Sequence, residues 1–244
     1  MKKLLTFAII WGALLAFLPS CNNAGYSLNE FRVNIATVQP LDGGAFSLLL
    51  DDGRNLWPAA SAIRYFPREN QRVFLNYTIL SGRHGEFDHL IRINNIWNIL
   101  TKQVIELTAE NADKIGDDPV IINRMWEGGD FLNVSFTFNW GGTRPHYINL
   151  VKNTTVENTF DDVIELEFRH NAYGSRNSFN RDGFVSFDLR PFRIEGQDEI
   201  IFLIRVNEPS GERIIEVIYE PNRAAHTRDT EDFPIPVITS NEVY

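Results

Sequence analysis

The chain has 244 residues, 43% of them hydrophobic, which is enough for one large or two small globular domains, and two are expected. Its 32 acidic residues outnumber its 23 lysines and arginines, and no cluster of basic residues offers the positive face that contacts with phosphates require. This charge balance excludes nucleic acid as a partner. The single cysteine, Cys21, rules out an internal disulfide, so the fold depends on its hydrophobic core.

The first 20 residues have the pattern of an export signal. Two lysines precede an apolar run over 4–17, and a Leu-Pro-Ser segment then leads to Cys21. A cysteine in this place is acylated in bacterial lipoproteins before the signal is removed. We therefore predict a signal peptide over 1–20, lipidation of Cys21 and a polar tether over 21–30. The alternatives are a plain secreted protein or an uncleaved membrane anchor, but the apolar run is short for a span of about 20 residues.

Residues 31–100 are predicted to form five short strands, because apolar and polar residues alternate and turn motifs separate the runs. In the first strand Phe31, Val33 and Ile35 are expected to share one face. Asp51-Asp52-Gly53 is a hairpin signal. This density of strands favours a small OB-like five-stranded barrel, and a five-stranded sheet with one covered face is the alternative. The expected strands are 31–37, 46–50, 54–57, 72–80 and 87–99, with an irregular connection over 59–70.

Residues 101–119 are polar and rich in turn residues, which predicts a linker between two domains. Regular short strands with turns between them then predict a C-terminal β-sandwich over 120–221, and the expected fold class is all-β. The clearest strand is 131–140, in which Leu132, Val134, Phe136, Phe138 and Trp140 alternate with polar residues. Residues 222–244 contain two prolines and many polar residues, and a flexible tail is expected there.

The sequence contains no recognisable catalytic motif, and we predict no catalytic residues, no cofactor and no metal ligands. The Gly-x-Ser-x-Gly pattern of a nucleophilic serine is absent, and the one cysteine is assigned to lipid. The histidines are scattered, without the spacing of a zinc-protease helix, and a composite metal site is the weaker alternative. They are His84, His89, His146, His170 and His226.

Adjacent acidic residues and exposed aromatic residues are the remaining candidates for a site. Asp51-Asp52 and Asp117-Asp118 could act as paired carboxylates, but acids beside glycine and proline are more often turn residues. The glycine pairs lack the spacing and the lysine of a phosphate loop. Trp57, Trp97, Trp126 and Trp140 could line a binding face, but core positions are favoured, because Trp140 falls on the apolar side of its strand.

Several stretches, in their order and spacing, make the chain similar to a known family. They are 35–38, 56–60, 76–80, 107–111, 126–130 (Trp-Glu-Gly-Gly-Asp), 149–153 and 168–174 (Phe-Arg-His-Asn-Ala-Tyr-Gly). With these stretches the chain resembles the NigD-like family of lipoproteins from Bacteroidota. The resemblance implies an N-terminal OB-like domain and a C-terminal β-sandwich, supplies no catalytic residues, and suggests a role in immunity through a link to bacteriocin operons.

The function expected from these observations is that of a non-enzymatic binding or bacteriocin-immunity lipoprotein. The expected partners are the membrane, through lipid on Cys21, and an envelope protein or glycan. The alternative is a hydrolase of envelope glycans or peptides with a site built from dispersed carboxylates. The residues after Cys21 are Asn-Asn-Ala-Gly rather than acidic, so an outer-membrane anchor that faces the periplasm is favoured over surface display.

Overall fold

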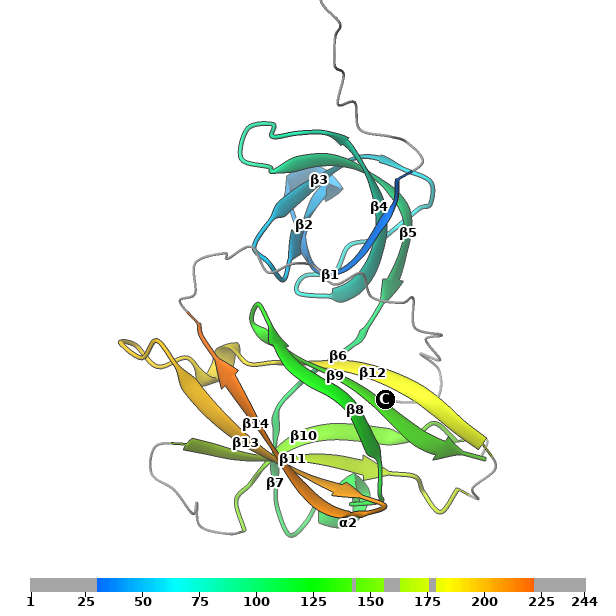
Figure 1. The fold of residues 1–244 in the computed structure, drawn as a ribbon, viewed down its shortest axis with the longest axis vertical. Coiled ribbons are helices and arrows are strands. Elements are labelled where there is room, and N and C mark those ends of the chain that lie inside the picture. Colours follow the sequence, from blue (N-terminus) through cyan, green and yellow to red (C-terminus); the bar gives the residue numbers. More distant parts are fainter. Residues whose placement is uncertain (1–29, 142–143, 156–162, 176–178, 222–244) are drawn as a thin grey trace, which may run out of the picture.

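The computed structural model describes residues 30–141, 144–155, 163–175 and 179–221, and the first part of this chain is a closed barrel. Its strands follow one another around the barrel in the order β1-β2-β3-β5-β4 (Figure 1). This is the order of an OB fold, and it confirms the prediction of an OB-like five-stranded barrel. The strands are β1 (Arg32–Pro40), β2 (Phe46–Leu50), β3 (Asn55–Ser61), β4 (Arg72–Ser81) and β5 (His89–Asn98), with a 3₁₀ turn over Asp42–Gly44.

The barrel is filled by alternate residues of its strands, as the period of two predicts. The expected inner face of β4 is confirmed, since Val73, Leu75 and Tyr77 are all fully buried in the barrel core. The face of β1 that carries Ile35 is turned away from the barrel core. Ala36 of β1 points into the barrel, whereas Ile35 points outward and is buried in a separate cluster against the second domain.

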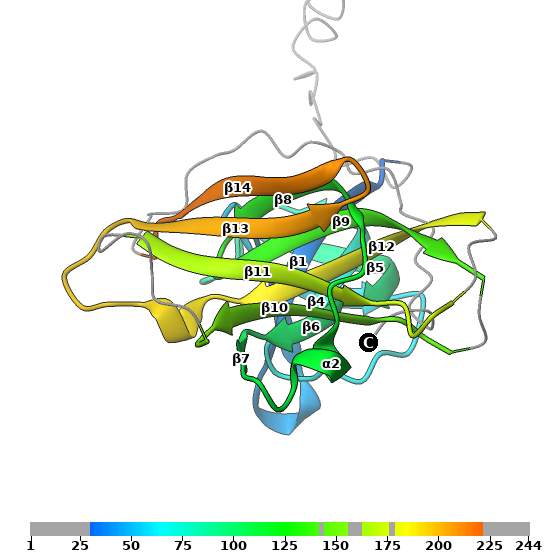
Figure 2. The same cartoon turned by 90° about the horizontal axis from the view of Figure 1, so that it is seen from below.

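The rest of the described chain forms a β-sandwich of two sheets, which confirms the second half of the predicted fold. Figure 2 shows one sheet in the order β14-β13-β11-β10-β7, and the other has the order β6-β12-β9-β8. The elements are β6 (Leu100–Gln103), β7 (Ile105–Leu107), α2 (Ala112–Ile115), β8 (Ile121–Gly128), β9 (Phe131–Trp140), β10 (Tyr147–Asn153), β11 (Val163–Asn171), β12 (Phe179–Asp188), a 3₁₀ turn over Arg190–Phe192, β13 (Ile200–Glu208) and β14 (Gly211–Tyr219).

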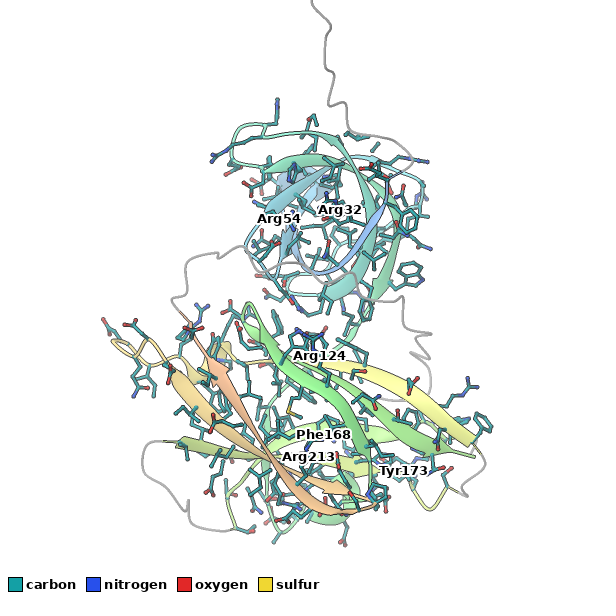
Figure 3. All side chains as sticks on the ribbon, viewed as in Figure 1. Arg32, Arg54, Arg124, Phe168, Tyr173 and Arg213 are labelled. Atoms are coloured by element: carbon teal, nitrogen blue, oxygen red, sulfur yellow. The ribbon has the colours of Figure 1, made fainter. Side chains whose placement is uncertain are left out.

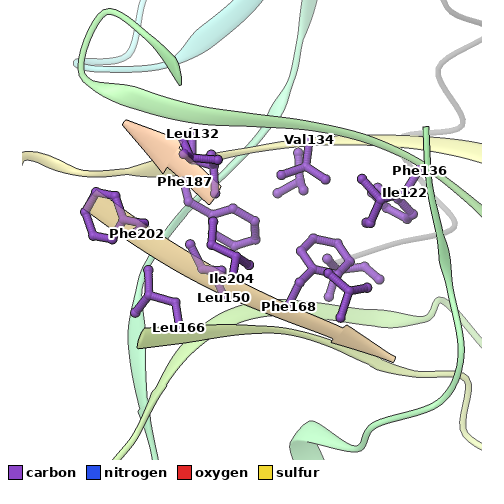
Figure 4. Packing of buried hydrophobic residues seen from close by; sticks show 14 of the residues in the cluster. Ile122, Leu132, Val134, Phe136, Leu150, Leu166, Phe168, Phe187, Phe202 and Ile204 are labelled. Carbon is purple, nitrogen blue, oxygen red and sulfur yellow. The ribbon is translucent and has the colours of Figure 1, made fainter. Parts of the chain in front are cut away.

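The sandwich core lies between the two sheets and is rich in aromatic rings (Figure 4). Phe168 of β11 meets Phe187 of β12 edge to face across the core, with ring centroids 6.2 Å apart. The predicted alternation in β9 is confirmed, because Leu132, Val134 and Phe136 are fully buried. Such rings bury large apolar areas, and their contacts join the two sheets.

Residues 101–119, expected to be a linker, instead hold strands of the sandwich. β6 pairs in parallel with β12, and β7 pairs in parallel with β10, so the chain passes from one sheet to the other between them. The prediction failed because these strands have only four and three residues and pair with segments far along the chain. Only Ile99, which is buried, separates the last barrel strand β5 from β6.

A buried polar network joins the barrel to the sandwich. Arg72 of β4 is 1% exposed and donates to both carboxylate oxygens of Asp51, at 2.5 and 2.7 Å. It also donates to Oδ1 of Asn133 in β9 at 3.2 Å, and Ser186 of β12 donates to the same oxygen at 2.7 Å. The Arg72 guanidinium lies over the Phe131 ring, 4.8 Å from its centroid. Buried polar groups arranged in this way fix one orientation of the two domains.

An apolar cluster lies beside this network at the same interface. Phe74 of β4 meets Phe184 of β12 at 4.8 Å between ring centroids, and Trp126 of β8 meets Phe184 at 5.6 Å. Ile35 and Ile99 complete the buried part of the cluster. The barrel therefore rests on the sandwich through the outer side of β1 and β4. Among the described residues, none of the helices has the length and hydrophobicity of a membrane span.

Candidate functional site

The side of the barrel that the sandwich leaves uncovered holds the candidate site. β1 lies next to the sandwich, whereas β3 lies on the far side of the barrel (Figure 1). Barrels of the OB type commonly bind ligands on the face of strands 2 and 3, with the loops between strands 1 and 2 and strands 4 and 5. The same elements are accessible here.

An aromatic pair marks the first half of this face. Leu56 of β3 points into the barrel and is fully buried, so its neighbour Trp57 points outward. Its ring lies 5.0 Å from that of Phe87, in the loop between β4 and β5. That loop is held against β3 because the Asn55 N–H donates to Asp88 Oδ2 and the Asp88 N–H donates to the Asn55 carbonyl, both at 2.8 Å.

A groove follows the second half of β3, because β2 and β3 pair over only two residues each. Leu48 pairs with Leu56 and Leu49 with Asn55, after which β3 continues along β5 alone. The Ala62 N–H donates to the Ile93 carbonyl of β5 at 2.8 Å. In a parallel ladder the backbone N–H and C=O groups of successive residues face opposite neighbouring strands. Because the Ala62 N–H faces β5, the N–H and C=O of Ser61 face the opposite side, where β2 no longer pairs with β3.

The groove has a volume of about 440 Å³ and is mainly apolar. The rings of Phe46 and Tyr65 lie 5.6 Å apart, and the Tyr65 hydroxyl donates to Asn98 Oδ1 at 2.9 Å. Burial raises the pKa of Tyr65, so this hydroxyl keeps its proton. Arg64 is the charged residue of the lining, which consists of Phe46, Pro58, Ala59, Ala60, Ser61, Ile63, Arg64, Tyr65 and Ile93. We call this groove, together with Trp57 and Phe87, the β3 face.

Charged residues near the start of β3 are paired with one another. Arg54 donates from Nε to Asp52 Oδ2 at 2.8 Å, and the Arg54 N–H donates to Asp52 Oδ1 at 3.0 Å. Figure 3 shows Arg54 and Arg32 on the barrel. Burial, together with the charge of Arg54, lowers the pKa of His89. The face thus offers aromatic and aliphatic surface with few free charges, which suits binding better than proton transfer.

Two of the five scattered histidines meet in the structure, inside the sandwich. His146 is fully buried, His170 is 2% exposed, and His146 Nδ1 lies 2.9 Å from His170 Nε2. The His146 ring also contacts Phe138 and Trp140, each at 5.1 Å between centroids. Burial lowers the pKa of His146 to about 4 and lowers that of His170. This pair is a core element, and the described residues contain no group of three metal-ligating side chains.

The paired acids are turn and ion-pair residues, as the sequence favoured. Asp51 binds Arg72 and Asp52 binds Arg54, both in the turn between β2 and β3. Asp117 pairs with Arg169 at 2.9 Å, and Asp118 accepts the Ala172 N–H at 2.7 Å, so neither pair forms an open carboxylate site.

The tryptophans divide between the surface of the barrel and the buried clusters. Trp97 and Trp126 pack at the domain interface and Trp140 packs on the sandwich core, whereas Trp57 belongs to the β3 face. Sequence reasoning missed the groove, although Pro58 inside a strand was a signal, since proline is confined to positions without a second ladder partner. Cys21 and His226 lie outside the described residues.

Comparison with known proteins assigns the family. Residues 35–99 match the NigD-like N-terminal OB domain, and residues 103–219 match the NigD-like C-terminal β-sandwich domain. A toxin-related protein from Parabacteroides distasonis is 34% identical, with a TM-score of 0.69 over 79% of this chain and 95% of that one. A protein of unknown function from Bacteroides vulgatus is 28% identical, with a TM-score of 0.69 over 87% and 98%.

A third solved structure shares the fold at lower identity. This is a NigD-like immunity protein from Bacteroides caccae, 20% identical, with a TM-score of 0.61 over 81% of this chain and 100% of that one. The search of curated proteins found no match. The two family matches, in the order barrel then sandwich, together with the relative at 34% identity, place this chain in the NigD-like family.

Proposed function

We propose that this protein is a lipid-anchored envelope protein that acts by binding a partner, as an immunity protein would, and not by catalysis. The observation that carries the proposal is the β3 face, an aromatic surface and groove on the side of the barrel that the sandwich leaves free. The similarity to a protein named as an immunity protein supports this role. The adjacent acids Asp51-Asp52 and Asp117-Asp118 are engaged in ion pairs or turns, and His146 and His170 lie in the core.

The anchor is the lipid proposed on Cys21, with the protein on the outer membrane and facing the periplasm. The support is the order of residues over positions 1–20, where two lysines are followed by an apolar run and then by a short segment that ends at the cysteine. Polar residues follow the cysteine. In a detergent-partition experiment the wild type enters the detergent phase, and Cys21→Ser enters the aqueous phase. A serine variant that remains in the membrane fraction contradicts the anchor.

The partner proposed for the β3 face is a protein or glycan of the envelope. Aromatic rings give a large contact area to either class, and the net charge of −9 opposes nucleic acid. The partner would be reached at the free side of the barrel, where Trp57 and Phe87 stand together.

The test uses a strain that lacks the protein and is complemented with variants. Wild type restores resistance to the cognate bacteriocin and captures one reproducible partner by crosslinking in envelopes, whereas the double variant Trp57→Ala with Phe87→Ala loses both. Phe179→Ala removes an aromatic residue of the sandwich that is 48% exposed, and this matched control keeps both. Turnover of peptidoglycan or glycan by the purified protein, abolished by one Asp or Glu substitution, would overturn the proposal and make the protein a hydrolase.

A further inference from the structure

The polar side chains that line the groove are mostly engaged within the protein. Three of the lining residues have polar side chains, namely Ser61, Arg64 and Tyr65. The Ser61 hydroxyl donates to the Ile63 carbonyl at 2.6 Å, and the Tyr65 hydroxyl donates to Asn98 Oδ1 at 2.9 Å. Each hydroxyl has a single proton, so neither donates to a ligand while these bonds are kept. The side-chain donor that the groove offers to a ligand is therefore the Arg64 guanidinium.

The positive charge of Arg64 is available to a carboxylate. Arg64 is exposed at the rim of the groove, and no carboxylate of the described residues forms an ion pair with it. Arg68 is also exposed, and it lies close enough that its charge lowers the pKa of Tyr65 against the effect of burial. Over residues 30–99 the arginines and the acidic residues are equal in number, so the net negative charge of the chain lies outside the barrel. The planar guanidinium fork matches a carboxylate, which therefore meets attraction at this rim.

The rest of the groove surface is apolar and held in place. Phe46, Ile63 and Tyr65 pack against the barrel core, so the two rings, 5.6 Å apart, are fixed before a ligand arrives. The volume of about 440 Å³ lies in the range of small ligand pockets, roughly 300–1,000 Å³. The groove thus gives an apolar side chain a preformed place of suitable size.

A sugar fits this lining less well than an apolar side chain does. A sugar ring carries several hydroxyl groups, and each one that is buried without a hydrogen-bond partner costs free energy. The Ser61 and Tyr65 hydroxyls are already engaged, and a single guanidinium cannot serve all the hydroxyls of a ring. An aliphatic or aromatic side chain needs no such partners and gains from the burial of its surface.

We propose that the groove receives an apolar side chain of a protein partner, and that Arg64 binds a carboxylate beside that side chain. The inference rests on the proposed function and narrows the partner class from a protein or glycan to a protein segment with an aliphatic or aromatic residue next to Asp or Glu. An apolar anchor in a pocket, with an arginine contact beside it, is the usual composition of an interface hot spot.

The probe is the peptide acetyl-Gly-Leu-Glu-Gly-amide, titrated into residues 21–244 with Cys21→Ser and followed by the NMR shifts of the Ala60 and Ile63 amides, both in the groove lining. The matched peptide has Gln in place of Glu and differs in charge but hardly in shape. We expect its Kd to be larger by roughly tenfold, because the charge-assisted hydrogen bonds to Arg64 are lost. A chitin oligosaccharide is the sugar probe and should leave both amides unshifted.

A charge exchange separates recognition by Arg64 from a structural role. Arg64→Glu should weaken binding of the Glu peptide by roughly tenfold or more, and it should bind acetyl-Gly-Leu-Lys-Gly-amide more tightly than the wild type does. Arg213→Gln, at an exposed ion pair of the sandwich, is the matched control and should change neither affinity. Ala60→Phe, at an exposed position, fills the groove and should abolish the shift at Ile63. Equal urea midpoints show that the variants are folded.

Equal affinities for the Glu and Gln peptides, or no shift with either peptide, overturn the inference. Shifts at Ala60 and Ile63 with the chitin oligosaccharide but not with the peptides also overturn it and assign the groove to a glycan. These titrations do not depend on bacteriocin resistance. If they fail while Trp57→Ala with Phe87→Ala still abolishes resistance, the proposed function stands with another partner chemistry. If that double variant keeps resistance, the proposed function fails whatever the peptides show.

Discussion

The His146–His170 pair should make the sandwich lose stability in mild acid, and its hydrogen bonds give the reason. His170 Nδ1 lies 3.3 Å from the Pro119 carbonyl, which can only accept, so this nitrogen carries the proton and His170 Nε2 is an acceptor. His146 Nδ1 then donates to it at 2.9 Å. The remaining His146 Nε2 is buried without a hydrogen-bond partner in the described structure, so a proton there would be neither solvated nor paired.

The size of the effect follows from the pKa of His146. Burial, together with the positive charge that His170 would carry, lowers this pKa from the ordinary 6.5 to about 4, while Asp118 acts in the opposite direction. Between these two pH values the unfolded chain binds a proton that the folded chain does not, so stability falls as the pH falls. The loss amounts to about 2 kcal/mol between pH 7 and pH 5 and to about 3 kcal/mol by pH 4.

The assay is urea unfolding followed by tryptophan fluorescence at pH 7, 6 and 5. This window separates the histidines from Glu167 and Asp188, whose lowered pKa values place their effect at more acidic pH. In His146→Phe the difference in stability between pH 7 and pH 5 shrinks by about 2 kcal/mol, whatever the absolute stability of the variant. His84→Gln, at an exposed position, leaves the difference unchanged. Equal pH dependence in wild type and His146→Phe would refute the reasoning.

Two further substitutions test the interface and the core. Arg72→Met leaves Asp51 without its buried partner and should lower the free energy of unfolding, measured in urea, by about 3 kcal/mol. Arg213→Met, at an exposed ion pair, should lower it by less than about 1 kcal/mol. Equal losses in the two variants would contradict the role of the network. Gly183→Ala places a methyl group 2.4 Å from Phe136 Cζ in the core and should lower stability by about 2 kcal/mol in a thermal melt; an unchanged melting temperature would show that the Phe136 ring can move aside.

The architecture was predictable because most strands carry a local signal. Alternation along β4 and β9 identifies their buried faces without knowledge of their partners, and the turns mark their ends. The same rule groups the residues of one face of β1, but it does not show that Ile35 meets the second domain and not the barrel core. Alternation of apolar and polar residues shows which side chains of a strand are buried. It does not show which of two hydrophobic cores buries them.

The candidate site was less predictable because its geometry is not local. The groove exists because the pairing of β2 with β3 ends at Leu48 and Leu56. Neither residue has a property from which the end of this pairing could be predicted. His146 lies directly before β10 and His170 lies in β11, 24 residues further along the chain, so the pairing of β10 with β11 brings them together. β6 was not predictable from its own residues either, because its parallel partner β12 lies some 85 residues further along the chain.

The direct passage from β5 through Ile99 into β6 has a consequence for the position of the molecule above a membrane. With the lipid that we propose on Cys21, the ten residues 21–30 would hold the start of the barrel within about 35 Å of the bilayer. A junction of one buried residue provides no hinge, so the sandwich would follow the barrel as one body. A partner of the β3 face in the proposed lipid-anchored protein would therefore meet it within the reach of this tether, which favours partners that are themselves in or near the membrane.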